Sequence, residues 1–231
     1  MVEFRSIEEF KLYFCDRVKL EAFLKNAGVK YSLDVSMCDA FLSVDLAGKT
    51  AAKIDEFNKS FLSEFHKEIY ALENASLEQE LLKLLKIGGA KISVAESFTG
   101  GNVSAKLTSV PGASEIFLEG IVAYSNEAKV ARLGVDGGTI KKFGAVSEQT
   151  AYEMACGLLK NPLCDLAVAT TGIAGPNGDG SDAPVGRCYI AAGNKNEIKV
   201  FKYDFSGDRK TITRLGTETA LYLAIKSLKN K

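Results

Sequence analysis

The spacing of hydrophobic residues changes along the chain. Over residues 6–26, and again from Thr50 to Tyr70, apolar residues recur every three or four positions, which predicts two helices. Between them, residues 29–37 and 39–48 alternate apolar and polar side chains, which predicts two strands. We therefore expect residues 1–73 to form a small α+β domain.

Beyond residue 73, strand-like and helix-like segments alternate. Ser76 is suited to cap a first helix. Strand-like segments follow at residues 92–97, 119–125, 164–172, 187–193 and 198–205, and helix-like segments at residues 101–110, 126–134, 147–160 and 208–230. This alternation is typical of an α/β fold, so residues 74–231 are expected to form a layered α/β/α domain.

Composition and charge narrow the function classes. Of the 231 residues 46% are hydrophobic, and 29 Lys and Arg balance 29 Asp and Glu. Because the net charge is zero, a nucleic-acid partner is not expected, and no apolar run reaches the ~18 residues of a membrane span. The first ten residues lack the pattern of a secretion signal. These features predict a folded cytoplasmic protein.

Cysteine and histidine usage constrains the chemistry. The five cysteines are widely spaced and form no C-x-x-C pair, which predicts buried thiols rather than disulfides or a zinc site. We expect no metal and no cofactor. The only histidine, His66, falls within the second predicted helix. A catalytic base would therefore be a lysine or a carboxylate.

The first candidate motif is A-E-S-F-T-G-G. A predicted strand ends at Glu96-Ser97, and a turn of Thr99, Gly100 and Gly101 precedes a helix. Such a junction offers backbone N–H groups to an anion. The alternative is that Thr99 only caps the helix and the glycines only turn the chain. The motif is not a Walker loop, because no Gly-Lys-Ser/Thr follows.

The second candidate motif is Y-S-N-E-A-K, residues 124–129, where a strand gives way to a helix. Ser125 or Asn126 is suited to cap this helix. Lys129 falls in its first turns, where the positive helix end favours a neutral amine. The alternative is that Lys129 is a solvated surface lysine.

Two further motifs follow strands. In A-T-T-G-I-A-G-P-N-G-D-G, Thr171 and Gly172 precede a loop rich in glycine and proline, and such loops commonly bind ligands. In F-S-G-D-R, Arg209 falls at a helix start and is suited to a bidentate contact with a phosphate or carboxylate. The alternative for Arg209 is an ordinary surface charge.

Seven motifs in order carry a family resemblance: A-E-S-F-T-G-G, V-P-G-A-S-E-I-F-L-E-G-I-V-A-Y-S-N-E-A-K, L-G-V, F-G-A-V-S-E, T-G-I-A-G-P-N-G, P-V-G and F-S-G-D-R. Together they resemble the C-terminal domain of the competence/damage-inducible protein CinA, the nicotinamide-nucleotide amidase (NMN deamidase, PncC) family, over residues 74–230. Residues 1–73 resemble, more faintly, a shortened form of the small KH-like domain that precedes it in full-length CinA. The molybdopterin-binding-like domain that opens full-length CinA has no counterpart in this sequence, so its pyrophosphatase activity is not expected.

The resemblance implies hydrolysis of the carboxamide of nicotinamide mononucleotide to nicotinic acid mononucleotide and ammonia, a step of pyridine-nucleotide salvage that needs no metal. Amide hydrolysis requires a nucleophile, a base and donors for the oxyanion. Ser97 is expected to be the nucleophile, Lys129 its general base, and Tyr124 a residue that orients Lys129 or relays a proton. Glu96 alternates to the opposite face of its strand, which predicts a supporting role.

The resemblance also implies a substrate pocket. The backbone of Thr99, Gly100 and Gly101 is expected to hold the oxyanion, and Thr171 and Arg209 the ribose or phosphate. Further binding residues are expected at Asn126, Ser147, Gly172 and Gly175. Relatives are commonly dimers, so a homodimer or higher homo-oligomer is expected.

Three departures from the family pattern affect the expected activity. Phe98 stands where the family usually has cysteine, Ala183 where a lysine is common, and Arg187 where a small residue is common. Two alternatives therefore stay open: a catalytically silent nucleotide-binding or competence-associated regulator, and an amidohydrolase of another small amide. A third, nucleic-acid binding by the KH-like domain, is disfavoured because the segment lacks a G-x-x-G clamp.

Overall fold

The computed structural model describes residues 7–229 and divides into two compact units at the boundary between Ser76 and Leu77. The N-terminal unit consists of β1 (Ile7–Tyr13), α1 (Arg17–Ala27), β2 (Lys30–Ser36), β3 (Asp39–Asp45), α2 (Ala51–Phe65) and β4 (Ile69–Ala71). Its antiparallel sheet has the strand order β2-β3-β1-β4. This is the split βαβ arrangement of ferredoxin-like folds. The expected KH-like relationship of this unit stays a prediction.

Two boundaries of the N-terminal unit differ from the sequence-based expectation. The helix predicted over residues 6–26 begins only at Arg17, because residues 7–13 form a strand that pairs with both β3 and β4. The helix predicted from Thr50 to Tyr70 ends at Phe65, and residues 69–71 pair with β1. The two strands predicted between the helices are confirmed as β2 and β3.

Aromatic packing fills the core of the N-terminal unit. Phe57, Phe61 and Phe65 recur at four-residue spacing on α2 and are buried. Phe10 of β1 lies against Phe61 with 4.5 Å between ring centroids. The apolar face of α2 thus covers one face of the sheet.

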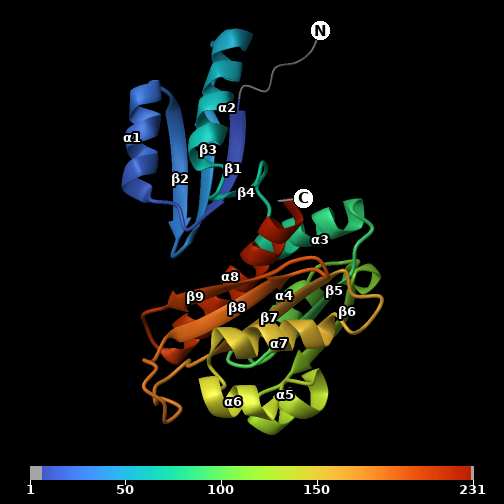
Figure 1. Ribbon diagram of the computed structural model, residues 1–231. Coiled ribbons are helices and arrows are strands. Elements are labelled where there is room, and N and C mark those ends of the chain that lie inside the picture. Colours follow the sequence, from blue (N-terminus) through green and yellow to red (C-terminus); the bar gives the residue numbers. More distant parts are fainter. Residues whose placement is uncertain (1–6, 230–231) are drawn as a thin grey trace. The chain divides into compact units, whose positions relative to one another are not determined.

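The C-terminal unit confirms the predicted α/β class. Its strands are β5 (Ile92–Glu96), β6 (Phe117–Val122), β7 (Leu166–Gly172), β8 (Arg187–Gly193) and β9 (Ile198–Asp204). Its helices are α3 (Leu77–Ile87), α4 (Asn102–Thr108), α5 (Asn126–Leu133), α6 (Gly137–Phe143), α7 (Glu148–Leu158) and α8 (Arg209–Lys229). Helices α5, α6 and α7 lie on one side of the sheet, and α3, α4 and α8 on the other (Figure 1).

Strand order determines where a ligand can bind in the C-terminal unit. The sheet runs β6-β5-β7-β8-β9, with β5 parallel to both β6 and β7, and β8 and β9 antiparallel. The chain leaves β5 first toward β6 and then crosses to β7 on its other side. In such sheets ligands bind outside the carboxyl ends of the strands where the connections diverge. Glu96 pairs in register with Val122 and Thr170, so the segments that follow these three strands meet at one edge.

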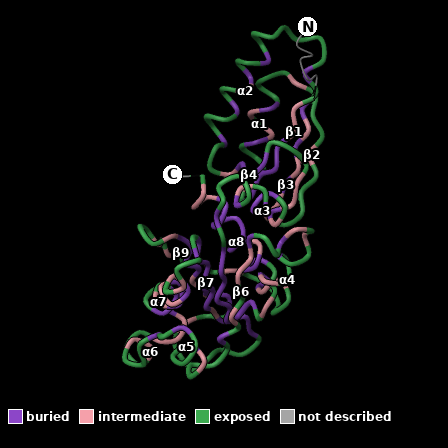
Figure 2. Tube along the Cα trace, turned by 90° about the vertical axis from the view of Figure 1, so that its right-hand side faces the viewer, coloured by how far each residue is buried: buried purple, intermediate pink, exposed green. Residues whose placement is uncertain are grey.

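The centre of the C-terminal unit is buried, and the unit contains one helix, α6, that the sequence patterns do not predict. The long helix α8 is buried over most of its length, as are the central strands (Figure 2). Helix α6 was not predicted; it opens with Gly137 and Gly138, two poor helix formers, and begins because the Asp136 side chain accepts a hydrogen bond from the Gly138 N–H at 3.0 Å.

Candidate active site

Ser97 lies at the end of β5 in a tight turn. Its backbone N–H donates to the Thr170 carbonyl oxygen at 3.0 Å, which ties the turn to β7. Only 7% of Ser97 is exposed. Gly100 and Gly101 follow with φ values of +60° and +98°, a left-handed conformation that favours glycine. The glycines therefore allow the chain to reverse directly after the serine and enter α4.

The buried carboxylate of Glu96 caps α4. Glu96 is fully buried, and its oxygens accept hydrogen bonds from the N–H groups of Gly101, Val103 and Ser104 at 2.9, 3.1 and 2.8 Å. They also accept one from the Ser104 hydroxyl at 2.7 Å. A carboxylate at a helix N-terminus satisfies donors that have no partner within the helix. The alternative that Thr99 caps this helix is wrong, because Glu96 does so.

The amide groups of the turn are partly used by these contacts. Gly101 N–H donates to Glu96, and Gly100 N–H donates to the Ser97 carbonyl oxygen at 3.1 Å. Within the described part of the chain, the N–H groups of Phe98 and Thr99 have no hydrogen-bond partner. The backbone N–H groups of Phe98 and Thr99 are therefore the donors in this turn that could bind an oxyanion without losing another hydrogen bond.

Lys129 approaches Ser97 from α5. The lysine is 2% exposed, and its Nζ lies 3.0 Å from Ser97 Oγ. Nζ also donates to the carbonyl oxygens of Ala123 at 3.0 Å and Tyr124 at 3.5 Å. Burial lowers the pKa of Lys129, an effect that Glu127 partly opposes. The alternative of a solvated surface lysine is therefore wrong.

The three contacts of Lys129 suit an ammonium, which would donate to all three oxygens, and they also suit a neutral amine. A neutral amine has two N–H groups and one lone pair. The two carbonyl oxygens are acceptors only, whereas the Ser97 hydroxyl is able to donate. In the neutral form, the two carbonyl oxygens accept from the two N–H groups, and the lone pair is left for the Ser97 O–H. This is the arrangement that a base requires before it removes a proton from a hydroxyl.

Tyr124 and Arg209 form the exposed border of this site. Arg209, the first residue of α8, donates from Nη2 to the Tyr124 hydroxyl and from Nη1 to the Gly175 carbonyl oxygen, both at 2.7 Å. Tyr124 is 58% exposed. Its contact with Lys129 is through the backbone carbonyl, and its hydroxyl is engaged by Arg209. Three loops that follow β6, β7 and β9 therefore meet at one guanidinium.

Other predicted binding residues have structural partners. Thr171 donates to the Ala145 carbonyl oxygen at 2.7 Å. Ser147 caps α7 by accepting from the Thr150 N–H at 3.2 Å. A Cβ on Gly172 would lie 3.0 Å from the Arg187 carbonyl oxygen, so this glycine allows β7 and β8 to pack closely. Asn126 is exposed at the start of α5, where Ser125 caps the helix by accepting from the Ala128 N–H.

Two further residues at this site, Thr170 and Asn102, do not stand out in the sequence. Thr170 lies on β7 next to the turn, and its Oγ1 is 2.7 Å from Thr99 Oγ1. Asn102 donates from Nδ2 to the Thr99 carbonyl oxygen at 2.5 Å. The paired threonines of the A-T-T-G motif are the only signal in the sequence for the first, because strand alternation sends Thr170 and Thr171 to opposite faces.

The three residues that depart from the family pattern, Phe98, Ala183 and Arg187, have different surroundings. The Phe98 ring is buried with Ala174, Cys188 and Ile212, so it belongs to the core under α8. Arg187 pairs with Asp204 of the neighbouring strand through both Nε and Nη2. The charge gained at Arg187 is thus compensated locally. Ala183 is partly exposed in the loop before β8.

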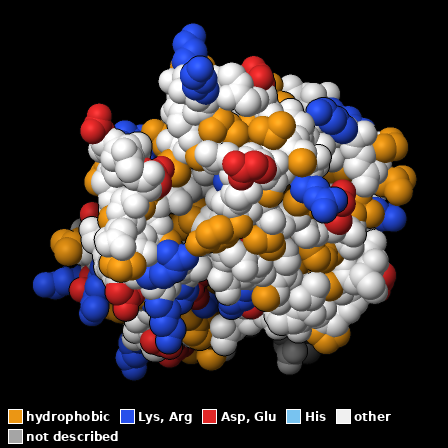
Figure 3. Space-filling model, turned by 90° about the horizontal axis from the view of Figure 1, so that it is seen from below, with side chains coloured by type: hydrophobic (Ala, Val, Ile, Leu, Met, Phe, Trp, Pro, Cys, Tyr) orange, Lys and Arg blue, Asp and Glu red, His pale blue; other side chains and the backbone are white. Residues whose placement is uncertain are grey.

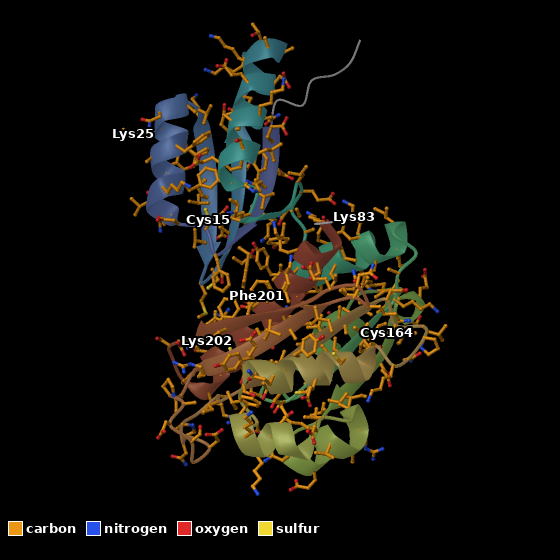
Figure 4. All side chains as sticks on the ribbon, viewed as in Figure 1. Cys15, Lys25, Lys83, Cys164, Phe201 and Lys202 are labelled. Atoms are coloured by element: carbon orange, nitrogen blue, oxygen red, sulfur yellow. The ribbon has the colours of Figure 1, made fainter. Side chains whose placement is uncertain are left out.

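The remaining cysteines and the histidine lie outside this site. Cys164 and Cys188 are buried, whereas Cys15, Cys38 and Cys156 are partly exposed. Figure 4 labels Cys15 in the N-terminal unit and Cys164 in the C-terminal unit. Burial raises the pKa of the Cys188 thiol to about 12, so it is a poor nucleophile. His66 is exposed and follows the last residue of α2.

The described residues form neither a membrane-spanning helix nor a metal site. No helix in residues 7–229 is both long and apolar enough to cross a membrane. The same residues contain no group of three or more His, Cys, Asp or Glu side chains arranged to hold a metal ion. On the face seen from below, Lys and Arg side chains stand among Asp, Glu and hydrophobic side chains (Figure 3).

Comparison with known proteins identifies relatives of this chain. A family model described as the CinA C-terminal domain matches residues 74–228. A competence-damage inducible protein of Caldicellulosiruptor saccharolyticus is 41% identical over 91% of the chain and 50% of its own length. A CinA-like protein of Thermotoga neapolitana is 39% identical over 96% of the chain and 55% of its own length. The chain thus spans about half the length of the curated relatives it matches.

A solved structure gives the same assignment for the fold. The crystal structure of a CinA-superfamily protein from Klebsiella pneumoniae superposes with a TM-score of 0.65 at 30% identity. The match covers 67% of this chain and 97% of that one.

Proposed function

The chain belongs to the CinA C-terminal domain family, and we propose that it hydrolyses the carboxamide of nicotinamide mononucleotide to nicotinic acid mononucleotide and ammonia. One observation carries the proposal: a buried lysine without a carboxylate partner among the described residues lies 3.0 Å from a serine hydroxyl at the edge of the sheet. Ser97 and Lys129 together provide the nucleophile and base that amide hydrolysis requires.

Acylation follows from the contacts of Lys129. The neutral Nζ removes the Ser97 proton as Oγ attacks the amide carbon, and the carbonyl oxygen of the substrate becomes an oxyanion. The free N–H groups of Phe98 and Thr99 are suited to stabilise this oxyanion. Lys129, now an ammonium, returns the proton to the departing nitrogen. Ammonia leaves, and an ester joins the substrate to Ser97.

Deacylation uses the same groups in reverse. Lys129 is neutral again after ammonia has left, and it removes a proton from water as the water oxygen attacks the ester carbon. The proton returns to Ser97 Oγ as the C–O bond breaks. The products are the carboxylic acid and the free serine, and no redox step or external group is required.

Arg209 and Tyr124 are assigned to substrate binding. The guanidinium is held by Tyr124 and Gly175 at the exposed side of the site, where it is suited to contact the ribose or phosphate of the mononucleotide. Thr171 is engaged by Ala145, so its role is to hold the neighbouring loop. A homo-oligomeric state and a cytoplasmic location stay predictions.

The decisive experiment measures ammonia release from nicotinamide mononucleotide by the purified protein without added metal, beside Ser97→Ala. We expect turnover in the wild type only, with the mononucleotide still bound by the variant in calorimetry. Turnover that persists in the variant removes Ser97 as nucleophile. Binding without turnover in the wild type favours a regulator, and release of ammonia only from other amides favours a different amidohydrolase.

A further inference from the structure

A cleft of about 920 Å³ lies between α4 and the first half of α8. Four cationic side chains line it, Lys106, Arg209, Lys210 and Arg214, and of these Lys106 is paired with Glu78 of α3 at 3.2 Å. Among the residues that the structure describes, the carboxylates that line it are Asp208 and Glu218. The volume is that of a small-molecule site.

The two carboxylates offset only part of the positive charge of the cleft, which holds four cationic side chains. Asp208 Oδ1 accepts a hydrogen bond from the Thr211 N–H at 2.8 Å and thereby caps α8. Glu218, whose side chain is 17% exposed, lies 3.9 Å from Arg214. Lys210 is exposed and forms no ion pair with any described residue. Arg209 donates to a carbonyl oxygen and a hydroxyl and forms no ion pair within residues 7–229.

The N-terminus of α8 lines the cleft. The helix is 21 residues long and begins with Arg209, and the carboxylate of Asp208, just before it, accepts from one of its first N–H groups. The N–H groups and the dipole at a helix N-terminus favour anions. Thr213 and Thr217 add hydroxyl groups to the lining, and Ala105 adds an apolar surface. The combination suits an anion attached to a less polar body.

The cleft adjoins the Ser97 site through two residues that belong to both. Asn102 lines the cleft and donates to the carbonyl oxygen of Thr99, two residues after Ser97. Arg209 lines the cleft and holds Tyr124, whose carbonyl oxygen accepts from Lys129. A ligand that occupies the cleft therefore reaches the border of the candidate active site.

We propose that the cleft between α4 and α8 binds a phosphate monoester, with Lys210 and Arg214 as its principal cationic contacts. Two sources share this chemistry: the phosphate of the mononucleotide substrate, and a separate phosphorylated ligand. Only the first source rests on the proposed function, because the binding of a phosphate ester does not require that amide hydrolysis occur.

The first test measures binding of ribose 5-phosphate and of ribose by calorimetry. We expect ribose 5-phosphate, but not ribose, to bind the wild-type protein, and Lys210→Met and Arg214→Met each to weaken it by about tenfold or more. Lys202→Met on β9 removes an equally exposed charge outside the cleft and serves as the control (Figure 4). Thermal unfolding verifies that all variants fold. Equal affinity in the wild type and the cleft variants, or binding of ribose alone, overturns the proposal.

The second test separates the two sources. If the cleft holds the substrate phosphate, Lys210→Met raises the KM for nicotinamide mononucleotide and leaves the KM for nicotinamide riboside, which has no phosphate, unchanged. If the cleft holds a separate ligand, ribose 5-phosphate binding falls while both KM values stay at the wild-type level. If the protein releases no ammonia from either compound, the proposed function is wrong. The calorimetry still shows whether the cleft binds a phosphate monoester.

Discussion

The carboxylate of Glu96 accepts hydrogen bonds from both the backbone N–H and the hydroxyl of Ser104, at 2.8 and 2.7 Å. Ser104 lies on the first turn of α4, and Glu96 directly precedes Ser97. The residue before the candidate nucleophile is thus fixed to the helix that follows it. The Glu96 side chain contacts the start of α4, whereas Lys129 contacts Ser97, so Glu96 acts on the site through the backbone.

Glu96→Gln is expected to lower both stability and turnover. The amide NH₂ group cannot accept the hydrogen bonds that one carboxylate oxygen now accepts, so buried N–H groups lose their partner at a cost of about 3 kcal/mol. Urea unfolding measures the loss. Because the turn at residues 97–101 loosens, kcat for ammonia release is expected to fall while the pH midpoint of activity stays unchanged.

Glu119→Gln is the matched control for this prediction. Glu119 is exposed on β6, so its substitution is expected to alter the free energy of unfolding by less than about 0.5 kcal/mol. If Glu96→Gln unfolds at the wild-type urea concentration and keeps full turnover, the carboxylate has no positioning role.

The activity is expected to rise with pH through an ionisation of Lys129. Only the neutral amine accepts the Ser97 proton, and burial lowers the pKa of Lys129 below the ordinary value of 10.5. The profile of kcat/KM against pH reports the free enzyme. Measured above about pH 7, where the substrate phosphate no longer titrates, it should show a single rise with a midpoint below 10.5. A midpoint at or above the ordinary lysine value contradicts the assignment.

The same ionisation is expected to affect stability. Since the pKa of Lys129 is lower in the folded than in the unfolded chain, the unfolded chain binds more protons between the two values, and stability rises with pH across that window. Lys129→Met removes the ionisable group. Urea unfolding of both proteins over a pH series should show wild-type stability rising relative to the variant as the pH approaches 10.5. A difference that is independent of pH contradicts a lowered pKa.

Sequence patterns predicted the strand ends at the site because the relevant signals are local. The strand before Ser97, the Thr-Gly-Gly turn and the helix that carries Lys129 each follow from a few neighbouring residues. The distance between Ser97 and Lys129 does not, since 32 residues separate them and only the parallel pairing of β5 and β6 brings their segments to one edge. From the sequence, the pairing of Ser97 with Lys129 is predicted only through the family resemblance.

The errors have a common physical origin in long-range pairing. Residues 7–13 carry apolar side chains at spacings that suit a helix as well as a strand. They form a strand because they pair with both β3 and β4. Likewise, Thr99 is a good capping residue by type, yet the Glu96 carboxylate takes that role and the Thr99 hydroxyl meets Thr170. Residue type predicted that a cap exists but not which side chain provides it.

Gly216→Ala is expected to destabilise the protein although alanine favours helices. A Cβ at this position of α8 would collide with the Phe98 ring, and overpacking of this kind costs about 1–3 kcal/mol, more than the ~1 kcal/mol gained in helix propensity. A smaller side chain in Phe98→Leu should relieve the collision, so the double variant should be more stable than the sum of the two single effects predicts. Gly137→Ala, which meets open space, is the control and should be neutral or stabilising. Additive effects in the double variant would show that Phe98 and Gly216 do not contact each other.

Residues 77–231 alone are expected to fold and to retain ammonia release. The boundary at Ser76 and Leu77 separates two units with their own sheets, and the candidate site draws all its contacts from the second. The Klebsiella pneumoniae structure, which matches 97% of its own length to only 67% of this chain, indicates that this fold exists without the first unit. Cooperative urea unfolding and a kcat/KM within about twofold of the full chain would support independence. A fragment that folds cooperatively but releases no ammonia would instead assign residues 1–76 a direct part in the reaction.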